Sequence, residues 1–538
     1  MKKALALILV LVLAVGMLAG CGGKGGNSGK DSGEAITELT LPLTKEKQEL
    51  SVWTIYSGTI VSDLNDIAGI KKMEEMTNVH INWIPVEQQQ GGDKFGLLLT
   101  SDNLPDIINY NSYPGGLEKG ISDGVIRKDM PELIDKYMPN YKKYLEENDY
   151  ARKQATFDDG TRKVIRLIVG EDFNCKAEGT YQGLAYRKDL LEGLGLAEPK
   201  TIAEWHDALV KAKASGINTP FVLHQTGGSH LSLSWGVETI NDSYLQIEGD
   251  KVVGSALQDG FGEYLDTMRA WYAEGLIDPN FTSFNYYLNP PASVENNEHL
   301  LYSWILSAFT GNNYYQMHMC NNESEFLQPI VAPAVKEGDE VVQSGDRIEA
   351  KDFTFISTSC KNPELAAKWI DFLYTKEGEL LNWYGIEGES YTMENGVPTF
   401  TDAMFSDPNG LAASDVLQKY ALGWGSCWIG KHNTAASEKV STVNAGGTNQ
   451  QKEAVDIWSA PKKNINFSRS TYTLTEEESD KINAKMTAVK TLIDEHMLKY
   501  IIGEDNTSFE DFKAQLLQYG YQEIIDTYQA SVDRFNKR

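Results

Sequence analysis

Hydrophobic and polar positions first fall into regular patterns after residue 46. Residues 49–55 are rich in β-branched and aromatic side chains and end at the polar stretch 56–58, which predicts a strand followed by a loop. Apolar residues then recur at helical spacing over 66–76 and alternate over 79–83 as they do in a strand. This β-α-β beginning predicts an open α/β sheet, in which ligands bind beyond the carboxyl ends of the strands.

Later helices are marked by their capping residues. In residues 201–204 and 475–478 a threonine precedes a glutamate by three positions, which is the spacing of a capping box. Asn362-Pro363 fits an N-cap followed by the first helical position. Ser508 with Asp511 repeats a similar start signal. We therefore predict helices that begin directly after each of these signals.

The N-terminus has the features of an export signal. Two lysines precede an apolar run, residues 4–18, that is shorter than the ~20 residues of a membrane-spanning helix. Residues 18–21 (LAGC) resemble the lipobox of bacterial lipoproteins, in which the cysteine receives diacylglycerol. Residues 1–20 are therefore predicted to be a signal peptide and Cys21 the lipidation site. Residues 21–46 are predicted to be a flexible linker.

The charge of the chain limits its partners. The formal net charge is −27, and removal of residues 1–20, which contain two lysines and no acidic residue, leaves −29. Such an acidic chain offers no basic face to the phosphates of a nucleic acid. It also argues against a body held flat on an anionic lipid leaflet.

Cysteines and histidines give no pattern of a metal or redox site. All eight histidines are isolated, and no C-x-x-C pair occurs, which argues against zinc and against a thioredoxin-like site. We predict no metal and no cofactor. The cysteines besides Cys21 are expected to be free, buried thiols, with disulfides left open as the alternative; they are Cys175, Cys320, Cys360 and Cys427.

Sequence motifs of catalysis are missing. The chain contains no H-E-x-x-H, no phosphate-binding P-loop and no G-x-S-x-G nucleophile elbow. The 76 acidic residues leave open a pair of facing carboxylates, as a glycosidase would need. We predict that the protein is not an enzyme, and keep an extracellular glycosidase as an alternative.

One long segment carries a family resemblance. Residues 184–205 follow the pattern L-x-Y-R-K-D-L-L-x-x-L-G-L-x-x-P-K-T-x-x-E-W, which resembles the type 2 extracellular solute-binding proteins of ABC importers. The L-P-D-I of 104–107, the G-L-I-D-P of 275–279 and the tail 520–535 resemble further segments of the same family. The Y-G-I-E-G of 384–388 resembles an element of its larger carbohydrate-binding lipoprotein members.

The resemblance implies an α/β fold with two lobes, each a mixed sheet flanked by helices, joined by hinge crossings around a ligand cleft. A chain of 538 residues also exceeds the ~100 to 200 residues of one usual domain. Lobe 1 is predicted to comprise residues 47–182 plus 332–385. Lobe 2 is predicted to comprise residues 183–331 plus 386–538.

The resemblance also implies a function. The protein would be a monomer, anchored by lipid to the extracellular face of the cell membrane, that captures an oligosaccharide and delivers it to the permease subunits of an ABC transporter. A peptide-binding lipoprotein and a lipoprotein that presents its ligand to a sensor are the alternatives. A peptide would call for a charged partner for one of its termini.

Candidate ligand-binding residues are aromatic or polar side chains near predicted loop ends. A pyranose has an apolar face and a rim of hydroxyls, so its site needs flat rings and a few fixed donors and acceptors. The family resemblance adds Trp304, because the corresponding stretch places an aromatic ring against the ligand. The complete set is Trp53, Tyr56, Asn109, Trp235, Trp304, Tyr384, Glu387, Trp424 and Trp428.

Overall fold

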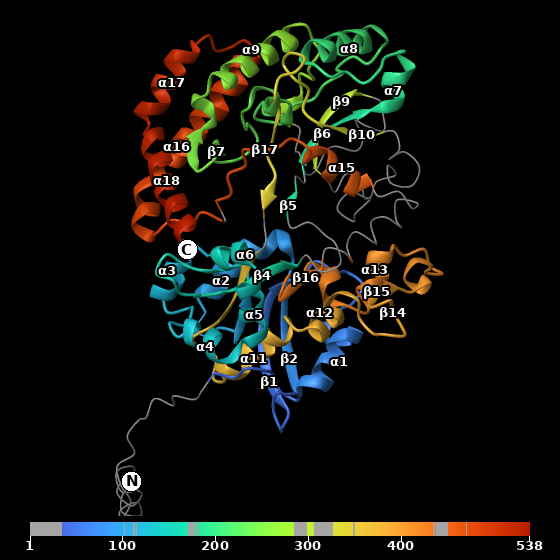
Figure 1. Cartoon of the computed structure of the whole chain (residues 1–538), viewed down its shortest axis with the longest axis vertical. Helices are drawn as coiled ribbons and strands as arrows, with labels where there is room; N and C mark the ends of the chain where they lie inside the picture. The colour runs from blue at the N-terminus through green and yellow to red at the C-terminus, as the bar shows by residue number, and fades with distance from the viewer. Residues whose placement is uncertain are drawn as a thin grey trace, which may run out of the picture. The chain divides into compact units, whose positions relative to one another are not determined.

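Six strands from distant parts of the chain form the first sheet (Figure 1). β1 lies between β2 and β3 and is parallel to both, whereas β13 runs antiparallel to β3 and β4, and β16 is parallel to β4. In order across the sheet the strands are β16 (Lys431–Asn433), β4 (Ile165–Gly170), β13 (Ala350–Ile356), β3 (Ile107–Asn109), β1 (Gln48–Ile55) and β2 (Val79–Val86).

This computed structural model describes residues 35–538, except for some short segments. The exceptions are residues 102, 111–112, 115, 171–177, 180–181, 284–297, 306–326, 348–349, 434–435, 437–449 and 470. Cys21, Cys175 and Cys320 therefore lie outside the described residues. Cys360 and Cys427 are free and buried, which confirms the prediction for these two thiols. Within the described part, no helix has the length and apolar character that a bilayer crossing needs.

The predicted β-α-β beginning is confirmed. β1 buries Leu50, Val52 and Trp53, and α1 (Ala68–Thr77) leads from it to β2. The chain then returns to the other side of β1 to form β3, so the strand order reverses between β1 and β3. The helices around this sheet are α2 (Gly91–Leu99), α3 (Leu117–Ser122), α4 (Met130–Tyr137), α5 (Pro139–Glu147), α6 (Asp149–Ala155), α11 (Pro363–Phe372) and α12 (Lys376–Trp383).

A second sheet has the order β10-β6-β9 and a separate hydrophobic core. Its strands are β6 (Gln182–Arg187), β9 (Leu301–Ile305) and β10 (Leu327–Ile330), and both neighbours run antiparallel to β6. α16 packs against α9 and α18 in this core (Figure 1). The helices are α7 (Lys188–Gly193), α8 (Ile202–Ala214), α9 (Asp259–Ala273), α15 (Gln450–Trp458), α16 (Glu476–Ile501), α17 (Phe509–Gln518) and α18 (Tyr521–Lys537).

The predicted helix starts are confirmed. Thr201 and Thr475 form complete capping boxes at the starts of α8 and α16. The side chain of Asn362 accepts a hydrogen bond from the backbone of Leu365 at the start of α11, and Ser508 accepts from Asp511 at the start of α17. Each side chain satisfies a backbone N–H that the first turn of a helix leaves without a partner.

Residues 384–428, which we call the hairpin module, build a small core of their own. The module contains the hairpin β14 (Tyr391–Glu394) and β15 (Val397–Phe400), the short helix α13 (Ala413–Leu417) and the turn η10 (Leu422–Gly425). Further short strand pairs are β7 (Leu245–Glu248) with β8 (Lys251–Gly254), β11 (Val342–Gln343) with β17 (Lys463–Asn464), and β5 (Glu178–Gly179) with β12 (Asp346–Arg347).

The position of the hairpin module contradicts the predicted start of the second segment of lobe 2. The sequence placed residues from 386 onward in lobe 2, but Leu422, Cys427 and Ile429 pack in the core of the first sheet. β16, which follows the module, also joins that sheet beside β4. The sequence of a short strand such as β16 does not show which distant strand it will pair with. For this reason the segment was assigned to the wrong lobe.

The predicted end of the flexible linker is also wrong: the backbone N–H of Ile36 donates to the carbonyl of Lys136, and Leu39 and Leu43 pack against the first core, so residues 36–46 belong to the folded body. The other lobe boundaries stay predictions.

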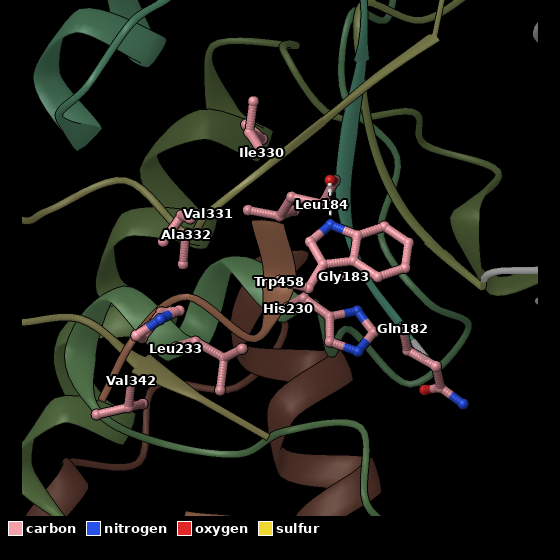
Figure 2. A pocket seen from close by; sticks show the side chains of 11 residues that line it. Gln182, Gly183, Leu184, His230, Leu233, Ile330, Val331, Ala332, Val342 and Trp458 are labelled. Carbon is pink, nitrogen blue, oxygen red and sulfur yellow. Dashed lines mark hydrogen bonds between the residues drawn. The ribbon is translucent and has the colours of Figure 1, made fainter. Parts of the chain in front are cut away.

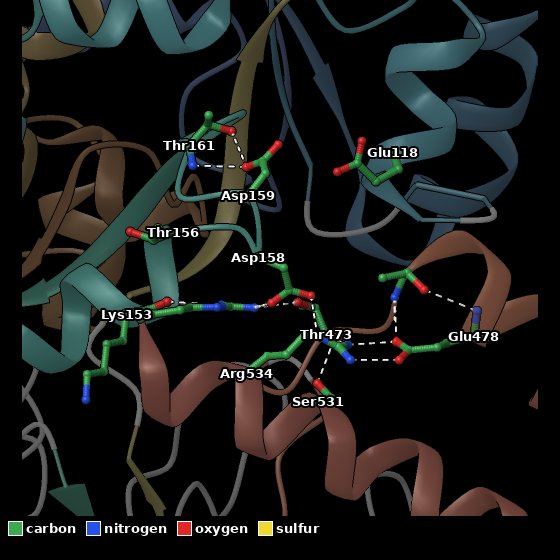
Figure 3. Close-up of polar contacts among 12 residues, drawn as sticks. Glu118, Lys153, Thr156, Asp158, Asp159, Thr161, Thr473, Glu478, Ser531 and Arg534 are labelled. Atoms are coloured by element: carbon green, nitrogen blue, oxygen red, sulfur yellow. Dashed lines mark hydrogen bonds and ion pairs between the residues drawn. The ribbon is translucent and has the colours of Figure 1, made fainter.

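A cluster of ion pairs joins α18 to the loop after α6 (Figure 3). Arg534 makes two hydrogen bonds of 2.7 Å to the carboxylate of Glu478 on α16, and its Nε donates to Asp158 at 2.6 Å. Arg538 donates to the other oxygen of Asp158, also at 2.6 Å. Asp158 follows a helix of the first core and Arg534 belongs to a helix of the second, so this cluster ties the two cores together away from the sheets.

We predict that Arg534→Ala lowers the free energy of unfolding by about 1.5 to 3 kcal/mol, because Glu478 loses its charged donor and Asp158 keeps only Arg538 of its two. The measurement is the thermal unfolding midpoint. Lys499→Ala is the matched control, since Lys499 pairs with Glu495 on an exposed helix face and such a pair contributes less than about 1 kcal/mol. Equal shifts for the two variants would contradict the prediction.

Candidate functional site

The carboxyl ends of β1 and β3 are the point where the strand order of the first sheet reverses. In open α/β sheets the crevice at such a reversal is where ligands bind, because the loops that follow the two strands diverge there. The side chains at this point come from β1, β3, the loop after β1, and residues 422–428, which cover them.

Asn109, the last residue of β3, is the polar centre of this region. Its Oδ1 accepts a hydrogen bond of 3.0 Å from the hydroxyl of Thr54 on β1. Its Nδ2 donates to Thr354 Oγ1 on β13 at 2.9 Å and to the carbonyl of Trp428 at 3.0 Å. Asn109 is 6% exposed, so this buried amide holds three strands and the covering loop together.

The covering loop packs directly on Tyr56. The backbone N–H of Ser57 donates to the carbonyl of Gly425 at 2.7 Å. A Cβ atom at position 425 would lie 1.9 Å from the Tyr56 ring, so only glycine allows this approach. Ser426 continues the turn in the left-handed region, with a φ of 64°. The loop therefore has a tightly defined shape above the end of β1.

Two neighbouring hydroxyls are buried under this loop. Tyr56 Oη and Ser57 Oγ have no hydrogen-bond partner among the residues that the structure describes. Burial raises the pKa of Tyr56 to about 12, with a smaller contribution from nearby Cys427, so the phenol stays protonated. Buried polar groups nearly always have partners in folded proteins, and unpartnered ones mark strained or functional positions.

Aromatic rings stack with Trp428 of the covering loop. The ring centroids of Trp383 and His432 are 4.5 Å apart and those of Trp428 and His432 are 6.1 Å apart, and both pairs of rings are nearly parallel. Trp428 is half-buried. Trp424 is also half-buried and donates its indole N–H to the carbonyl of Trp383 at 2.8 Å. The half-buried rings have the flat apolar character that stacking on a sugar requires.

The structure thus brings together Tyr56, Asn109, Trp424 and Trp428 from the predicted set. Trp53 is 2% exposed and packs against Phe95 and Tyr110 in the core of the first sheet. That ring has no open face for a ligand.

Two other predicted residues lie in the hairpin module. Tyr384 is 3% exposed, and its ring stacks on Phe400 at 4.7 Å. Glu387 is exposed on the turn before β14. Tyr384 is therefore a packing residue of the module, whereas Glu387 faces solvent.

Two predicted tryptophans belong to the second core. Trp235 is half-buried at the end of a 3₁₀ turn and packs edge-on against Tyr264, 5.8 Å away. Trp304 lies in β9, paired with Gly183 of β6, and its side chain lies outside the described residues.

The sequence did not single out Trp458, at the end of α15. Its indole N–H donates to the carbonyl of Leu184 at 2.8 Å, and its ring lies so close to β6 that a Cβ at Gly183 would come within 2.5 Å (Figure 2). Buried His230 faces the same cavity of about 10 Å³, room for one water molecule. A glycine within an apolar strand is the signal that could have indicated this close approach.

No group of three or more His, Cys, Asp or Glu side chains that could hold a metal ion occurs among the described residues. The polar side chains at the ends of β1 and β3 are neutral hydroxyls and an amide. They can donate and accept hydrogen bonds, and the adjacent rings can stack on an apolar face. This combination fits a polyhydroxylated neutral ligand.

Comparisons with known proteins show the family of the chain. The family model described as bacterial extracellular solute-binding protein matches residues 65–380. The chain is 26% identical over 547 residues to the fructooligosaccharide ABC transporter substrate-binding protein FusA of Streptococcus pneumoniae, covering 98% of this chain and 97% of FusA. It is 24% identical over 403 residues to the polygalacturonan/rhamnogalacturonan-binding protein YtcQ of Bacillus subtilis, covering 72% of this chain and 73% of YtcQ.

Solved structures share the fold. FusA in complex with kestose superposes with a TM-score of 0.67 at 22% identity, over 91% of this chain and 99% of that chain. A solute-binding protein from Bifidobacterium longum infantis, described as binding human milk oligosaccharides (HMO), gives a TM-score of 0.70 at 15% identity, over 91% and 99% of the two chains. The predicted two-lobed α/β fold is thereby confirmed.

We predict that Asn109→Asp destabilises the protein by about 1 to 3 kcal/mol although the two side chains have the same shape, because a carboxylate cannot donate to Thr354 and faces the carbonyl of Trp428. Thermal unfolding measures the effect. Asn483→Asp, on an exposed position of α16, is the control and should shift the midpoint little. A midpoint for Asn109→Asp equal to that of the control would contradict the role of the amide.

Proposed function

The chain belongs to the bacterial extracellular solute-binding proteins, and from that premise we propose that it captures an oligosaccharide outside the cell and delivers it to the permease of an ABC importer. The observation that carries this proposal is the similarity to FusA along nearly the whole length of both chains. YtcQ, whose name also describes a carbohydrate polymer as ligand, supports the same ligand class.

The site at the carboxyl ends of β1 and β3 suits such a solute. Half-buried Trp428 and Trp424 would stack on the apolar faces of sugar rings. The hydroxyls of Tyr56 and Ser57 would exchange hydrogen bonds with sugar hydroxyls, which both donate and accept. Closure of the two lobes around the solute by hinge motion would then produce the form that docks on the permease.

The proposal includes no catalysis. Glycoside hydrolysis uses two carboxyl groups on opposite sides of the bond that breaks, whereas the described residues at the end of β1 and β3 contribute hydroxyls, an amide and indole rings. The solute would therefore be released intact. A peptide is the second candidate ligand. Its binding would require a charged side chain to pair with one of the peptide's termini.

The proposed location is the extracellular face of the cell membrane. Residues 1–20 would be removed as a signal peptide, and Cys21 would carry the lipid, with each buried CH₂ group contributing ~0.8 kcal/mol to anchoring. The linker residues that precede residue 36 would let a monomeric body reach its permease.

The test of the ligand class is calorimetry of the purified protein without its signal peptide against fructooligosaccharides, pectin fragments and short peptides. We expect binding to at least one oligosaccharide. Trp428→Ala should weaken that binding by roughly tenfold to a hundredfold, because a stacking ring contributes about 1 to 3 kcal/mol.

Tyr519→Ala is the control for the loss of an aromatic ring. Tyr519 directly follows α17, and its side chain is 52% exposed. Its removal should therefore leave the affinity unchanged. Peptide binding without any oligosaccharide binding would overturn the proposed ligand class. Unchanged affinity in a folded Trp428→Ala variant would remove this ring from the site.

We predict that Cys21→Ala abolishes lipidation and releases the protein into the medium or leaves it poorly processed, because the acyl chains are the proposed anchor. Membrane fractionation with mobility on a denaturing gel measures this. Ser28→Ala, a change in the same linker, should keep native fractionation. A Cys21→Ala variant that stays in the membrane with native mobility would contradict the anchor.

A further inference from the structure

The hairpin module lies outside the part of the chain that the family model matches. That match ends at residue 380, and the module occupies residues 384–428. The module has its own small core, which includes Tyr384, Phe400, Met404 and Leu417. It therefore has a core of its own, while its last residues, Leu422 and Cys427, join the core of the first sheet. Its contacts with the rest of the protein indicate what it does.

Several of these contacts converge on the segment between β1 and α1. The carbonyls of Lys419 and Tyr420 accept from the backbone N–H groups of Ala68 and Gly69, at 3.0 and 2.9 Å. They satisfy donors at the first turn of α1, which has no side-chain cap. The carbonyl of Gly425 accepts from Ser57. The module thus holds both ends of the loop between β1 and α1, which starts where the strand order of the first sheet reverses.

Gln418 fixes the middle of that loop. Its Oε1 accepts from two successive backbone N–H groups, of Thr59 at 3.1 Å and Ile60 at 3.2 Å. Its Nε2 donates to Asp415 at 3.1 Å, which orients the amide. The side chain is 4% exposed, so these hydrogen bonds are shielded from water.

The loop held in this way carries the two buried hydroxyls. Tyr56 is 5% exposed, and its Oη, like Ser57 Oγ, has no partner within the described part of the chain. Leaving a buried hydroxyl unpaired costs about 1 to 3 kcal/mol. Hydrogen bonds with a bound solute would remove that cost, and a rigid loop would make them selective for solutes whose hydroxyls are correctly placed.

We propose that the hairpin module is the specificity wall of the solute site, with Gln418 as the positioning residue that holds the Tyr56–Ile60 loop against one end of an oligosaccharide. This inference rests on the proposed function and adds to it. The wall limits how far the sugar chain extends at this end, so the module sets the preferred chain length as well as the affinity.

The experiment compares affinities for a series of fructooligosaccharides or pectin fragments of increasing length, whichever series the unaltered protein binds. Gln418→Ala should reduce the preference between the best and the next longer oligosaccharide by about fivefold to tenfold, because the loop loses both hydrogen bonds and yields to the longer chain. A merely structural role for Gln418 would weaken all lengths by the same factor.

A swapped pair provides the rescue. In Asp415→Asn/Gln418→Glu a carboxylate oxygen still accepts from Thr59 and Ile60, and the new amide donates where the old carboxylate accepted. The length preference should return to within about twofold of the unaltered protein. Val210→Ala, at a 40% exposed position of α8, is the control and should keep the native preference.

Tyr56→Phe tests the wall even if Gln418→Ala unfolds. It removes only the unpaired hydroxyl, so we expect a thermal midpoint equal to or above that of the unaltered protein, together with affinity reduced by about threefold to tenfold. Unchanged affinity in this variant, or an equal loss for all lengths in Gln418→Ala, would overturn the wall. Failure of the unaltered protein to bind any oligosaccharide would instead overturn the proposed function.

Discussion

The hydrogen bonds of the Asn109 amide are the constraint on which the functional end of the molecule depends. One buried side chain accepts from Thr54 on β1 and donates to Thr354 on β13 and to the carbonyl of Trp428. The sequence separations are 55, 245 and 319 residues, so this amide joins parts of the chain that fold from distant positions. Because the amide is buried, losing a partner would leave one of its polar atoms without a hydrogen bond, and the geometry is held closely.

From that centre the arrangement extends in two directions. On the side of the proposed site, the covering loop packs Gly425 against Tyr56 and leaves Trp428 half-buried. Away from it, the hairpin module supplies acceptors for the loop after β1 and for the start of α1. The site is thus rigid on the side of the first sheet. Such rigidity favours binding in a hinge-bending protein, because less of the binding free energy is lost to ordering the pocket when the lobes close.

Much of the fold was predictable from sequence because its signals are local. The capping boxes at Thr201 and Thr475 and the alternation of residues 79–83 in β2 depend on residues within a few positions of each other. The site was less predictable, because a tryptophan on a strand and a tryptophan in a loop look alike in sequence. Trp53 and Tyr384 became packing residues, whereas Trp424 and Trp428 stayed half-buried. Gln418 has no local signal at all, since its partners lie 358 and 359 residues earlier.

We propose that the solute binds at the carboxyl ends of β1 and β3, against the covering loop. Hydrogen–deuterium exchange of the protein with and without a saturating oligosaccharide, whose binding calorimetry has confirmed, tests it most directly. We expect exchange to slow most at residues 56–60 and 422–429, because a bound sugar would reduce opening of the loop whose amides donate to Gly425 and Gln418. Confirmed binding with slower exchange only in other segments would contradict it.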